Sequence, residues 1–434
     1  MKTPETLKLE KRRDTLLAWR GIVHMSERVW TSVLYDVSNV TMIVGDDGII
    51  LVDTGMIPEN ARATLDEFRR VTDKPVKAII YTHGHGDHTG ASSVFAAEGN
   101  DVEVWARSNF GAETLPFEQT GLMPLFARRG TRQGGFALPP EKRICNGVSL
   151  VMYPKAKGAI FSGKTGAVMP NRFFDGADMK LTLCGVELEL IATPGETTDA
   201  LAVWIPSERI LCAGDDIYRS FPNVYPVRGT PPRDLPSWIS SLERMMELDA
   251  QGVVPGHTMP FCGAEQSRTA LRNYRDALKH IFEATIEGMR QGMGPDELVR
   301  TVKLPPHLAA LDDLGEYYGN IAWTVRGIYS AYIGWFGNDP LELTTFGAKE
   351  EALGMVELVG GVGGLADRAR EALERGNAHW ASRLASHLLT LEPENRAYRE
   401  LKAQTLDAVA ESILTATGRN YAYTVAQELR QPEE

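Results

Sequence analysis

The order of apolar and polar residues over roughly the first 260 positions predicts short strands interspersed with helices. The β-branched runs Val40–Val44 and Ile49–Val52 are joined by Asp46-Asp47-Gly48, a sequence typical of a β-hairpin. Two further hairpins are predicted over 181–192 and 200–213, where apolar runs flank turn residues. Hairpins with helices between them predict an α/β fold in which helices pack in layers on sheets.

Two predicted elements precede a polar segment of unusual composition. A helix is expected over 58–70, with a proline near its start, and a strand over 76–81 leads directly into His83–His88. The stretch from about Phe110 to Arg172 shows no clear period and is interpreted as a long insertion. Insertions of that size often shape a binding site.

After about Gly263 the strand-like runs end and helical periodicity takes over. One predicted helix carries an apolar face at 3, 4 and 7 spacing, within a block rich in aromatic residues. The residues of this block are Tyr317, Tyr318, Trp323, Val325, Ile328, Tyr329, Tyr332, Trp335 and Phe336. Such a block is compatible with a helical core or with a subunit interface, because interface centres favour aromatic side chains.

From Leu365 to Leu429 the helices are predicted in pairs, with small residues facing large ones and Pro393 in a turn. This arrangement resembles tetratricopeptide-type helix pairs. One and a half such units are too few for a free-standing solenoid, so they are expected to pack on another part of the chain. The change in pattern predicts two domains, 1–262 and 263–434.

Composition narrows the classes of partner. The chain has 434 residues and a net charge of −11, which argues against nucleic acid, whose binders gain affinity by neutralising phosphates. A small anion would have to be held by local positive charge or metal. The chain has only four cysteines, too few for a disulfide framework. No apolar run is long enough to span a membrane, and no signal peptide is recognised, so the chain as given is expected to be cytoplasmic, or periplasmic or secreted if a leader was removed.

The strongest chemical signal is the segment His83-Gly-His85-Gly-Asp87-His88. Alternate residues of an extended strand point the same way, so His83 and His85 can share one metal, and Asp87 with His88 can face a second. Imidazole and carboxylate without thiolate suit zinc, and to a lesser degree iron or manganese. The alternative is a chance cluster of solvated polar residues.

Further ligands are available after later predicted strands. Glu196 follows Thr193-Pro-Gly, Asp215 follows Gly214, and His257 follows Pro255-Gly. Each is a polar residue at a strand end beside a glycine, where a rigid scaffold positions functional side chains. Together with the histidine cluster, they complete two metal sites.

These motifs, with Asp53-Thr-Gly before them, resemble the metallo-β-lactamase superfamily over residues 20–262. The resemblance implies an αββα sandwich. It implies that His83 and His85 bind one metal and that Asp87, His88 and His257 bind the other. It further implies that Asp215 bridges the two metals and that Asp53 orients a ligand histidine from outside.

Within that superfamily, Glu196 in place of the usual histidine resembles the alkyl sulfatases. The stretch from Asn223 to Arg228 is similar to the sulfate-gripping segment of that family, and the loop 165–171, ending at Asn171, to its second sulfate-side loop. The segments 304–306, 317–319, 332–336 and 418–420 are similar to its all-helical dimerisation domain. Nearly the whole chain is thus covered, and the resemblance implies a homodimer.

The sequence departs from the family in three ways. Asp215 is shorter than the usual bridging glutamate, and Glu196 lies one residue earlier after Pro-Gly than the family's glutamate. The chain ends at Glu434, without the sterol-carrier-like domain that offers an apolar surface to long alkyl chains. Shorter or different esters are therefore expected as substrates.

The resulting expectation is a dinuclear zinc hydrolase of a small anionic ester, foremost an alkyl sulfate. Asp87 and Asp215 are the expected catalytic carboxylates, and Arg228, Asn223 and Asn171 the expected substrate-binding residues. The guanidinium of Arg228 is a permanently charged fork suited to sulfate oxygens, unless it pairs with Asp234 at the surface. Alternatives are hydrolysis of a lactone, thioester, β-lactam or phosphoester, iron-dependent persulfide oxidation, and a protein-binding module with a structural metal.

Overall fold

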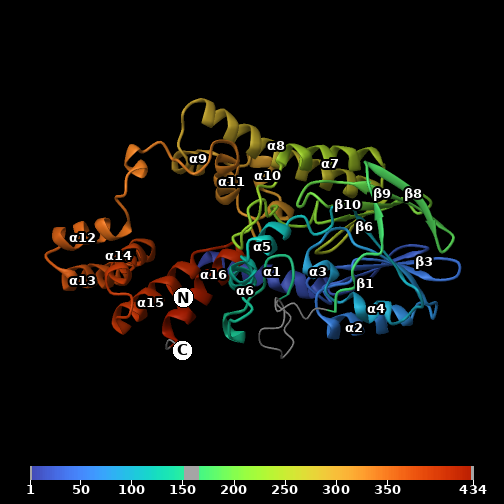
Figure 1. The fold of residues 1–434 in the computed structure, drawn as a ribbon, viewed down its shortest axis with the longest axis horizontal. Helices are drawn as coiled ribbons and strands as arrows, with labels where there is room; N and C mark the ends of the chain where they lie inside the picture. The colour runs from blue at the N-terminus through green and yellow to red at the C-terminus, as the bar shows by residue number, and fades with distance from the viewer. Residues whose placement is uncertain (1, 151–165, 432–434) are drawn as a thin grey trace.

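The computed structural model describes residues 2–150 and 166–431, and its first half is built on two sheets (Figure 1). The first sheet has seven strands in sequence order, antiparallel from β1 to β4 and parallel from β4 to β7. Its strands are β1 (Gly21–Ser26), β2 (Val29–Val33), β3 (Val40–Val44), β4 (Ile49–Val52), β5 (Val76–Ile80), β6 (Glu103–Arg107) and β7 (Arg172–Phe174).

The second sheet has six strands in the order β13-β12-β11-β10-β9-β8, and only β11 and β12 are parallel. The hairpins predicted over 40–52, 181–192 and 200–213 are confirmed. The strands of this sheet are β8 (Asp178–Leu183), β9 (Val186–Ala192), β10 (Leu201–Ile205), β11 (Ile210–Gly214), β12 (Gly252–Pro255) and β13 (Phe261–Cys262).

The side chains of the strands divide between an inner and two outer layers. In β4, Ile50 and Val52 join the core between the sheets, whereas Ile49 and Leu51 face the helices on the outer side. In β10, Val203 faces the inner core and Ala202 the helices over the second sheet. Strands buried on both faces read as continuous apolar runs, which is why they lack alternation in the sequence. The predicted αββα sandwich is confirmed.

Helices cover both outer faces and the edge that carries the polar loops. The predicted helix over 58–70 is α2, and the region predicted to lack periodic structure contains α6. Proline at the start of α6 and Gly135 in the left-handed conformation (φ 68°) after its end are the signals that mark it. The helices of this half are α1 (Pro4–Trp19), α2 (Pro58–Arg69), α3 (Gly86–Thr89), α4 (Ser92–Ala96), α5 (Leu115–Gln119), α6 (Met123–Gly134), the 3-10 turn η1 (Pro140–Lys142) and α7 (Leu235–Glu247).

The second half is helical, as predicted, and begins after the last strand. Helices α8, α9 and α11 share one core cluster with α7 and the second sheet, so this part of the helical region packs directly on the sandwich. Its elements are α8 (Ala264–Arg290), α9 (Pro295–Thr301), α10 (Pro306–Ala309), η2 (Asp312–Leu314), α11 (Ile321–Ile333), η3 (Pro340–Leu343), α12 (Ala348–Leu358), α13 (Val362–Glu374), α14 (Ala378–Leu391), α15 (Arg396–Glu411) and α16 (Ala416–Arg430).

Helices α12–α16 form a group at the end of the molecule away from the sheets (Figure 1). Consecutive helices from α13 to α16 pack on one another across short turns, in agreement with the predicted helix pairs. The group is anchored to the sandwich half through α16, where Glu428 pairs with Arg132 of α6. Asn420 of α16 donates to the carbonyl of Cys145 (3.4 Å).

Candidate metal centre

Four strands from the two sheets end at one edge, and the predicted ligands lie in the loops that follow them. The segment His83–His88 follows β5, Glu196 follows β9, Asp215 follows β11, and His257 follows β12. The sheets meet there directly, because the N–H of Leu201 donates to the carbonyl of Thr82 (2.8 Å).

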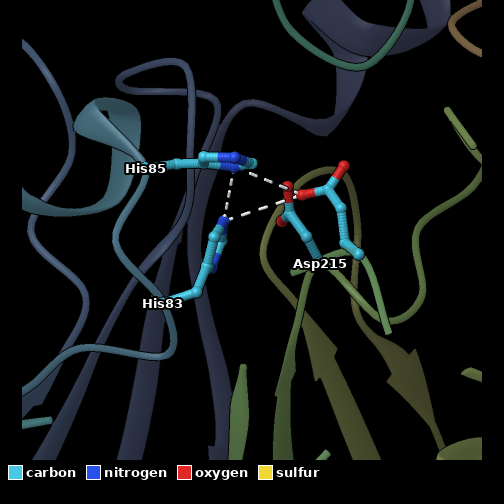
Figure 2. Close-up of side chains that lie close together, drawn as sticks. His83, His85 and Asp215 are labelled. Atoms are coloured by element: carbon cyan, nitrogen blue, oxygen red, sulfur yellow. Dashed lines mark hydrogen bonds and ion pairs between the residues drawn. The ribbon is translucent and has the colours of Figure 1, made fainter. Parts of the chain in front are cut away.

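The first group of candidate ligands comprises His83, His85, Glu196 and Asp215. His83 Nε2 lies 2.7 Å from His85 Nδ1, and Glu196 Oε2 lies 3.6 and 3.4 Å from these two nitrogens. Figure 2 shows both imidazole rings pointing toward the side on which Asp215 lies. One atom from each residue of this group lies within 4.8 Å of the others, a spacing that one cation can occupy.

The second group comprises Asp87, His88 and His257. Asp87 Oδ2 lies 3.5 Å from His257 Nε2 and 3.8 Å from His88 Nε2. Asp215 joins both groups, since its Oδ1 lies 3.4 Å from His88 Nε2 and its Oδ2 lies 3.0 Å from His257 Nε2. Asp215 can lie close to the loop that carries His257 because residue 256 is glycine, where any Cβ would collide with Asp215 Oδ1.

The donor set fits two divalent cations. His88 Nε2, Glu196 Oε2 and Asp215 Oδ1 are buried, and none has a hydrogen-bond partner within residues 2–150 and 166–431. Leaving a buried polar atom unpaired costs about 1–3 kcal/mol, so three such atoms facing one space indicate a missing partner. Imidazole nitrogens and carboxylate oxygens are the ligands that zinc accepts in sites that keep an open position.

Outer partners fix the orientation of the ligands of the second group. Asp53 Oδ2 lies 2.7 Å from His88 Nδ1, and Asp53 is itself held by the N–H and hydroxyl of Thr82 (both 2.8 Å). The Nδ1 of His257 bonds the carbonyl of Val37 (2.7 Å). In each histidine Nε2 is thereby left to face the cluster. This is the position in which the sequence resemblance places Asp53.

Two buried residues of the site were not identified from the sequence. Glu113, in the turn before α5, contacts His85 Nε2, and Arg233 donates to Glu196 Oε1 (2.6 Å) and Glu113 Oε1 (3.3 Å). Both lie far in sequence from the histidine motif, and neither has a local pattern that distinguishes it from a surface residue. The one signal available was the position of Glu113 inside the insertion.

The charges of the site act strongly on one another. Burial alone would lower the pKa of His85, but Glu113 and Glu196 together raise it to about 9. Burial would raise the pKa of Asp215, but His257 and His88 hold it well below the usual value. The carboxylate of Asp215 is therefore ionised at neutral pH, as a metal-binding carboxylate must be.

Arg228 lies beside the cluster, not at the surface. Its Nη2 is 3.0 Å from His85 Nε2 and its Nη1 is 3.4 Å from Glu113 Oε1, while the guanidinium lies over the ring of Phe126. The alternative pairing with Asp234 does not occur, because Asp234 accepts instead from the hydroxyl of Ser237.

The two predicted asparagines occupy different surroundings. Asn223 is buried beside the cluster, and its backbone carbonyl accepts from Arg233 (2.6 Å). Asn171 is not brought to the cluster, because its side chain accepts from the N–H of Val104 (2.9 Å) and donates to the carbonyl of Val102 (3.1 Å). Thr165, at the start of the same predicted loop, lies outside the described residues.

A cavity of about 520 Å³ opens onto the ligands. His85, Asp87, Asp215 and Arg228 line its polar part, and Tyr318 and Thr417 reach it from the helical half. Much of the remaining lining is apolar and comes from the insertion and the adjacent loop. These residues include Met56, Phe110, Leu115, Met123, Phe126, Phe136, Ala167, Val168 and Met169.

Comparison with known proteins agrees with this geometry. Residues 35–257 match the metallo-beta-lactamase superfamily, and residues 294–432 match the family described as alkyl sulfatase dimerisation. A linear primary-alkylsulfatase of Pseudomonas sp. is 32% identical over 89% of this chain and 73% of its own length. An (R)-specific secondary-alkylsulfatase of Pseudomonas sp. is 30% identical over 94% of this chain, which spans 62% of that relative.

The solved structure of a stereoselective inverting sec-alkylsulfatase from Pseudomonas sp. has the same fold along nearly the whole chain. The TM-score is 0.85 at 27% identity, covering 95% of this chain and 66% of the other. In the part of the chain that the structure describes, no helix is both long and apolar enough to cross a bilayer. The family resemblance seen in the sequence is confirmed: the chain belongs to the alkyl sulfatase family, hydrolases of sulfate esters within the metallo-β-lactamase superfamily.

Proposed function

We propose that this chain hydrolyses alkyl sulfate esters, releasing an alcohol and inorganic sulfate, at a centre that holds two zinc ions. The observation that carries the proposal is the position of Arg228. Its guanidinium contacts His85 and lines the same cavity as a set of apolar side chains, so a charged head group and an alkyl chain can be bound side by side.

His83, His85 and Glu196 would hold one ion, and Asp87, His88 and His257 the other, with Asp215 between them. Divalent zinc in such a site supplies Lewis acidity and makes water a competent nucleophile near neutral pH. Asp87 and Asp215 are the ligand carboxylates that line the cavity, and we assign them the catalytic role of orienting the attacking water through their oxygens.

The charge balance explains how a chain of net charge −11 accepts an anion. Three ligand carboxylates, Asp87, Glu196 and Asp215, oppose the four positive charges of two zinc ions. Arg228 and Arg233 add two positive charges, and Glu113 adds one negative charge. The centre is thus locally positive, and the planar fork of Arg228 matches the oxygens of a sulfate group. Buried Asn223 would add a neutral donor beside it.

The cavity favours an alkyl leaving group. Its apolar lining can remove methylene groups from water, which is worth about 0.8 kcal/mol for each group buried. The two Pseudomonas relatives are a linear primary-alkylsulfatase and a secondary-alkylsulfatase, which supports the same substrate class for this chain.

The proposed assembly is a homodimer formed through the helical half, in keeping with the match to the alkyl sulfatase dimerisation family. The buried face of α11, with Val325, Ile328 and Tyr329, belongs to the core, whereas Tyr332 and Trp335 beyond it are exposed. The aromatic block of the sequence is therefore divided between a core and a free surface.

The deciding experiment measures zinc content and sulfate release on the same sample. Alkyl sulfates from butyl to dodecyl form the series, with a lactone, a thioester and a phosphomonoester as comparison substrates. Close to two zinc ions per chain and sulfate release from part of the series are expected. Turnover of a comparison substrate without sulfate release would refute the proposal, and iron in place of zinc would refute the metal assignment.

A further inference from the structure

The structure gives the two oxygens of Glu113 separate partners. Oε2 contacts Nε2 of His85, whereas Oε1 accepts from Arg228 (3.4 Å) and Arg233 (3.3 Å) and from the hydroxyl of Thr230. Glu113 is 8% exposed, and burial of an ionised carboxylate is costly unless each oxygen is satisfied. Its position therefore depends on both groups of partners at once.

The two nitrogens of His85 are used on opposite sides of the ring. Nδ1 faces His83 Nε2 and Glu196 Oε2, the other atoms of the first ligand group, and Nε2 faces Glu113. A neutral imidazole carries one hydrogen, so a lone pair on Nδ1 requires the hydrogen on Nε2. A carboxylate that accepts this hydrogen fixes the required tautomer and the ring orientation.

We propose that Glu113 is a positioning residue for the first metal, holding His85 with Nδ1 toward the ion. It is the counterpart of Asp53, which contacts His88 Nδ1 (2.7 Å) in the second group. The inference rests on the proposed two-metal centre but not on which ester that centre hydrolyses.

The backbone around Glu113 supports this role. Asp199 Oδ2 accepts from the N–H of Gly84 (3.0 Å), between the two histidines, and from the N–H of Gly111 (2.8 Å), two residues before Glu113. One buried carboxylate thereby fixes the turn that carries Glu113 to the loop that carries His85. The contact between the two side chains is set by the scaffold, not by a flexible surface loop.

The same arrangement has a consequence for Arg228, whose Nη2 lies 3.0 Å from His85 Nε2. When Nε2 carries a hydrogen for Glu113, it offers Arg228 no lone pair. The Nη2 group then remains available to an anion while Nη1 stays next to Glu113. Glu113 thus connects the orientation of His85 with the availability of Arg228 Nη2 to an anion.

The test compares zinc binding by Glu113→Gln and Asp53→Asn with that of the wild-type chain. Each protein is stripped with a chelator and titrated with zinc against a chromophoric competitor, and bound ions are counted by native mass spectrometry. Glu187→Gln, which changes an exposed carboxylate on β9, is the control. Glu113→Gln is expected to weaken one of the two ions by about 10- to 100-fold. Asp53→Asn is expected to weaken the other, and the double variant both.

Glu113→Asp guards against a folding defect, because it keeps the charge opposite Arg228 and Arg233 but withdraws the carboxylate from His85. It is expected to fold, by circular dichroism, and still to lose affinity for one ion. Unchanged affinity for both ions in folded Glu113→Gln and Glu113→Asp would overturn the inference. A wild-type chain with two zinc ions but no sulfatase activity would instead refute the proposed function and leave this inference intact.

Discussion

Arg233 Nη1 lies 2.6 Å from Glu196 Oε1, and this buried ion pair occupies the oxygen of Glu196 that does not face His83 and His85. The other oxygen, Oε2, has no hydrogen-bond partner among the described residues. The ion pair thus holds the glutamate with one oxygen presented to the first ligand group. Arg233 also donates to Glu113, so one guanidinium is the counterion of two carboxylates.

Replacing Arg233 with methionine is expected to destabilise the zinc-free fold by about 3–5 kcal/mol, because Glu196 and Glu113 lose a buried counterion. Urea unfolding of the zinc-free protein measures this change. Arg209→Met, which removes a surface partner of Asp249, is the control and is expected to cost less than about 1 kcal/mol. Equal effects of the two substitutions would contradict the assigned role.

Arg228→Ala is expected to reduce kcat/KM for an alkyl sulfate by about 10- to 100-fold, the worth of one charge-assisted contact. Hydrolysis of a neutral ester at the same centre is expected to change little, because that substrate offers the guanidinium no anionic oxygen. Steady-state kinetics on both substrates measures the difference. Arg268→Ala, at the surface beside Asp249, serves as the control, and equal losses on both substrates would remove Arg228 from sulfate binding.

Much of the sandwich could be predicted because its strands are apolar runs separated by turn residues, and its ligands follow strand ends within short motifs. The metal-binding segment His83–His88 can be predicted without tertiary information, since its four candidate ligands lie within six consecutive residues. Glu113 and Arg233 could not be predicted in this way. Their role arises from contacts with His85 and Glu196, which are far away in sequence and come close only when the loops at the strand ends fold together.

Asn171 is a different case. Its expected role came from a family motif, whereas its side chain takes part in the pairing of β7 with β6. The residue lies just before β7, and its amide replaces a rung of the ladder to β6 by bonding Val102 and Val104. The prediction of no periodic structure is wrong for α6, whose sequence has an apolar face, a proline near its start and Gly135 after its end. For Asn171 the decisive interaction is between two segments, and the pattern within one segment does not reveal it.

The apolar cavity predicts a dependence on chain length. Leu115, which lines it and is half-exposed, can be enlarged to tryptophan without disturbing a ligand. Leu115→Trp is expected to lower kcat/KM for octyl and longer sulfates by roughly 4-fold for each methylene that no longer fits. Butyl sulfate is expected to be hydrolysed as before. A uniform loss along the series would show that the chain does not occupy this cavity.

The segment after α11 predicts the dimer contact. Ile333 and Trp335 are 57% and 70% exposed, and Leu341, Leu343 and Phe346, later in the same segment, are exposed as well. Large apolar side chains exposed together in one segment are typical of an interaction site. The double substitution Ile333→Glu and Trp335→Glu is expected to convert a dimer into a monomer by light scattering, with helical content unchanged. A monomeric wild-type chain at micromolar concentration would contradict the proposed assembly.

A pH dependence of stability is expected from Asp36, which is not itself a candidate ligand. Its side chain accepts from the N–H groups of Val37 (2.6 Å) and Ile57 (2.8 Å), yet burial raises its pKa to about 6. The folded protein therefore retains a proton that the unfolded chain releases near pH 4. The stability that this proton contributes is complete below about pH 4 and is lost as the pH rises through about 6.

Asp36→Asn removes this titration, because the amide stays neutral at every pH. The free energy of unfolding of the variant, relative to wild type, is expected to rise by up to roughly 3 kcal/mol between pH 4 and pH 7. Urea unfolding of both zinc-free proteins at several pH values measures that difference. Asp66→Asn, on the exposed side of α2, is expected to show no such trend. A constant gap between wild type and Asp36→Asn would mean that Asp36 is ionised in the folded protein throughout this range, with its two backbone donors outweighing its burial.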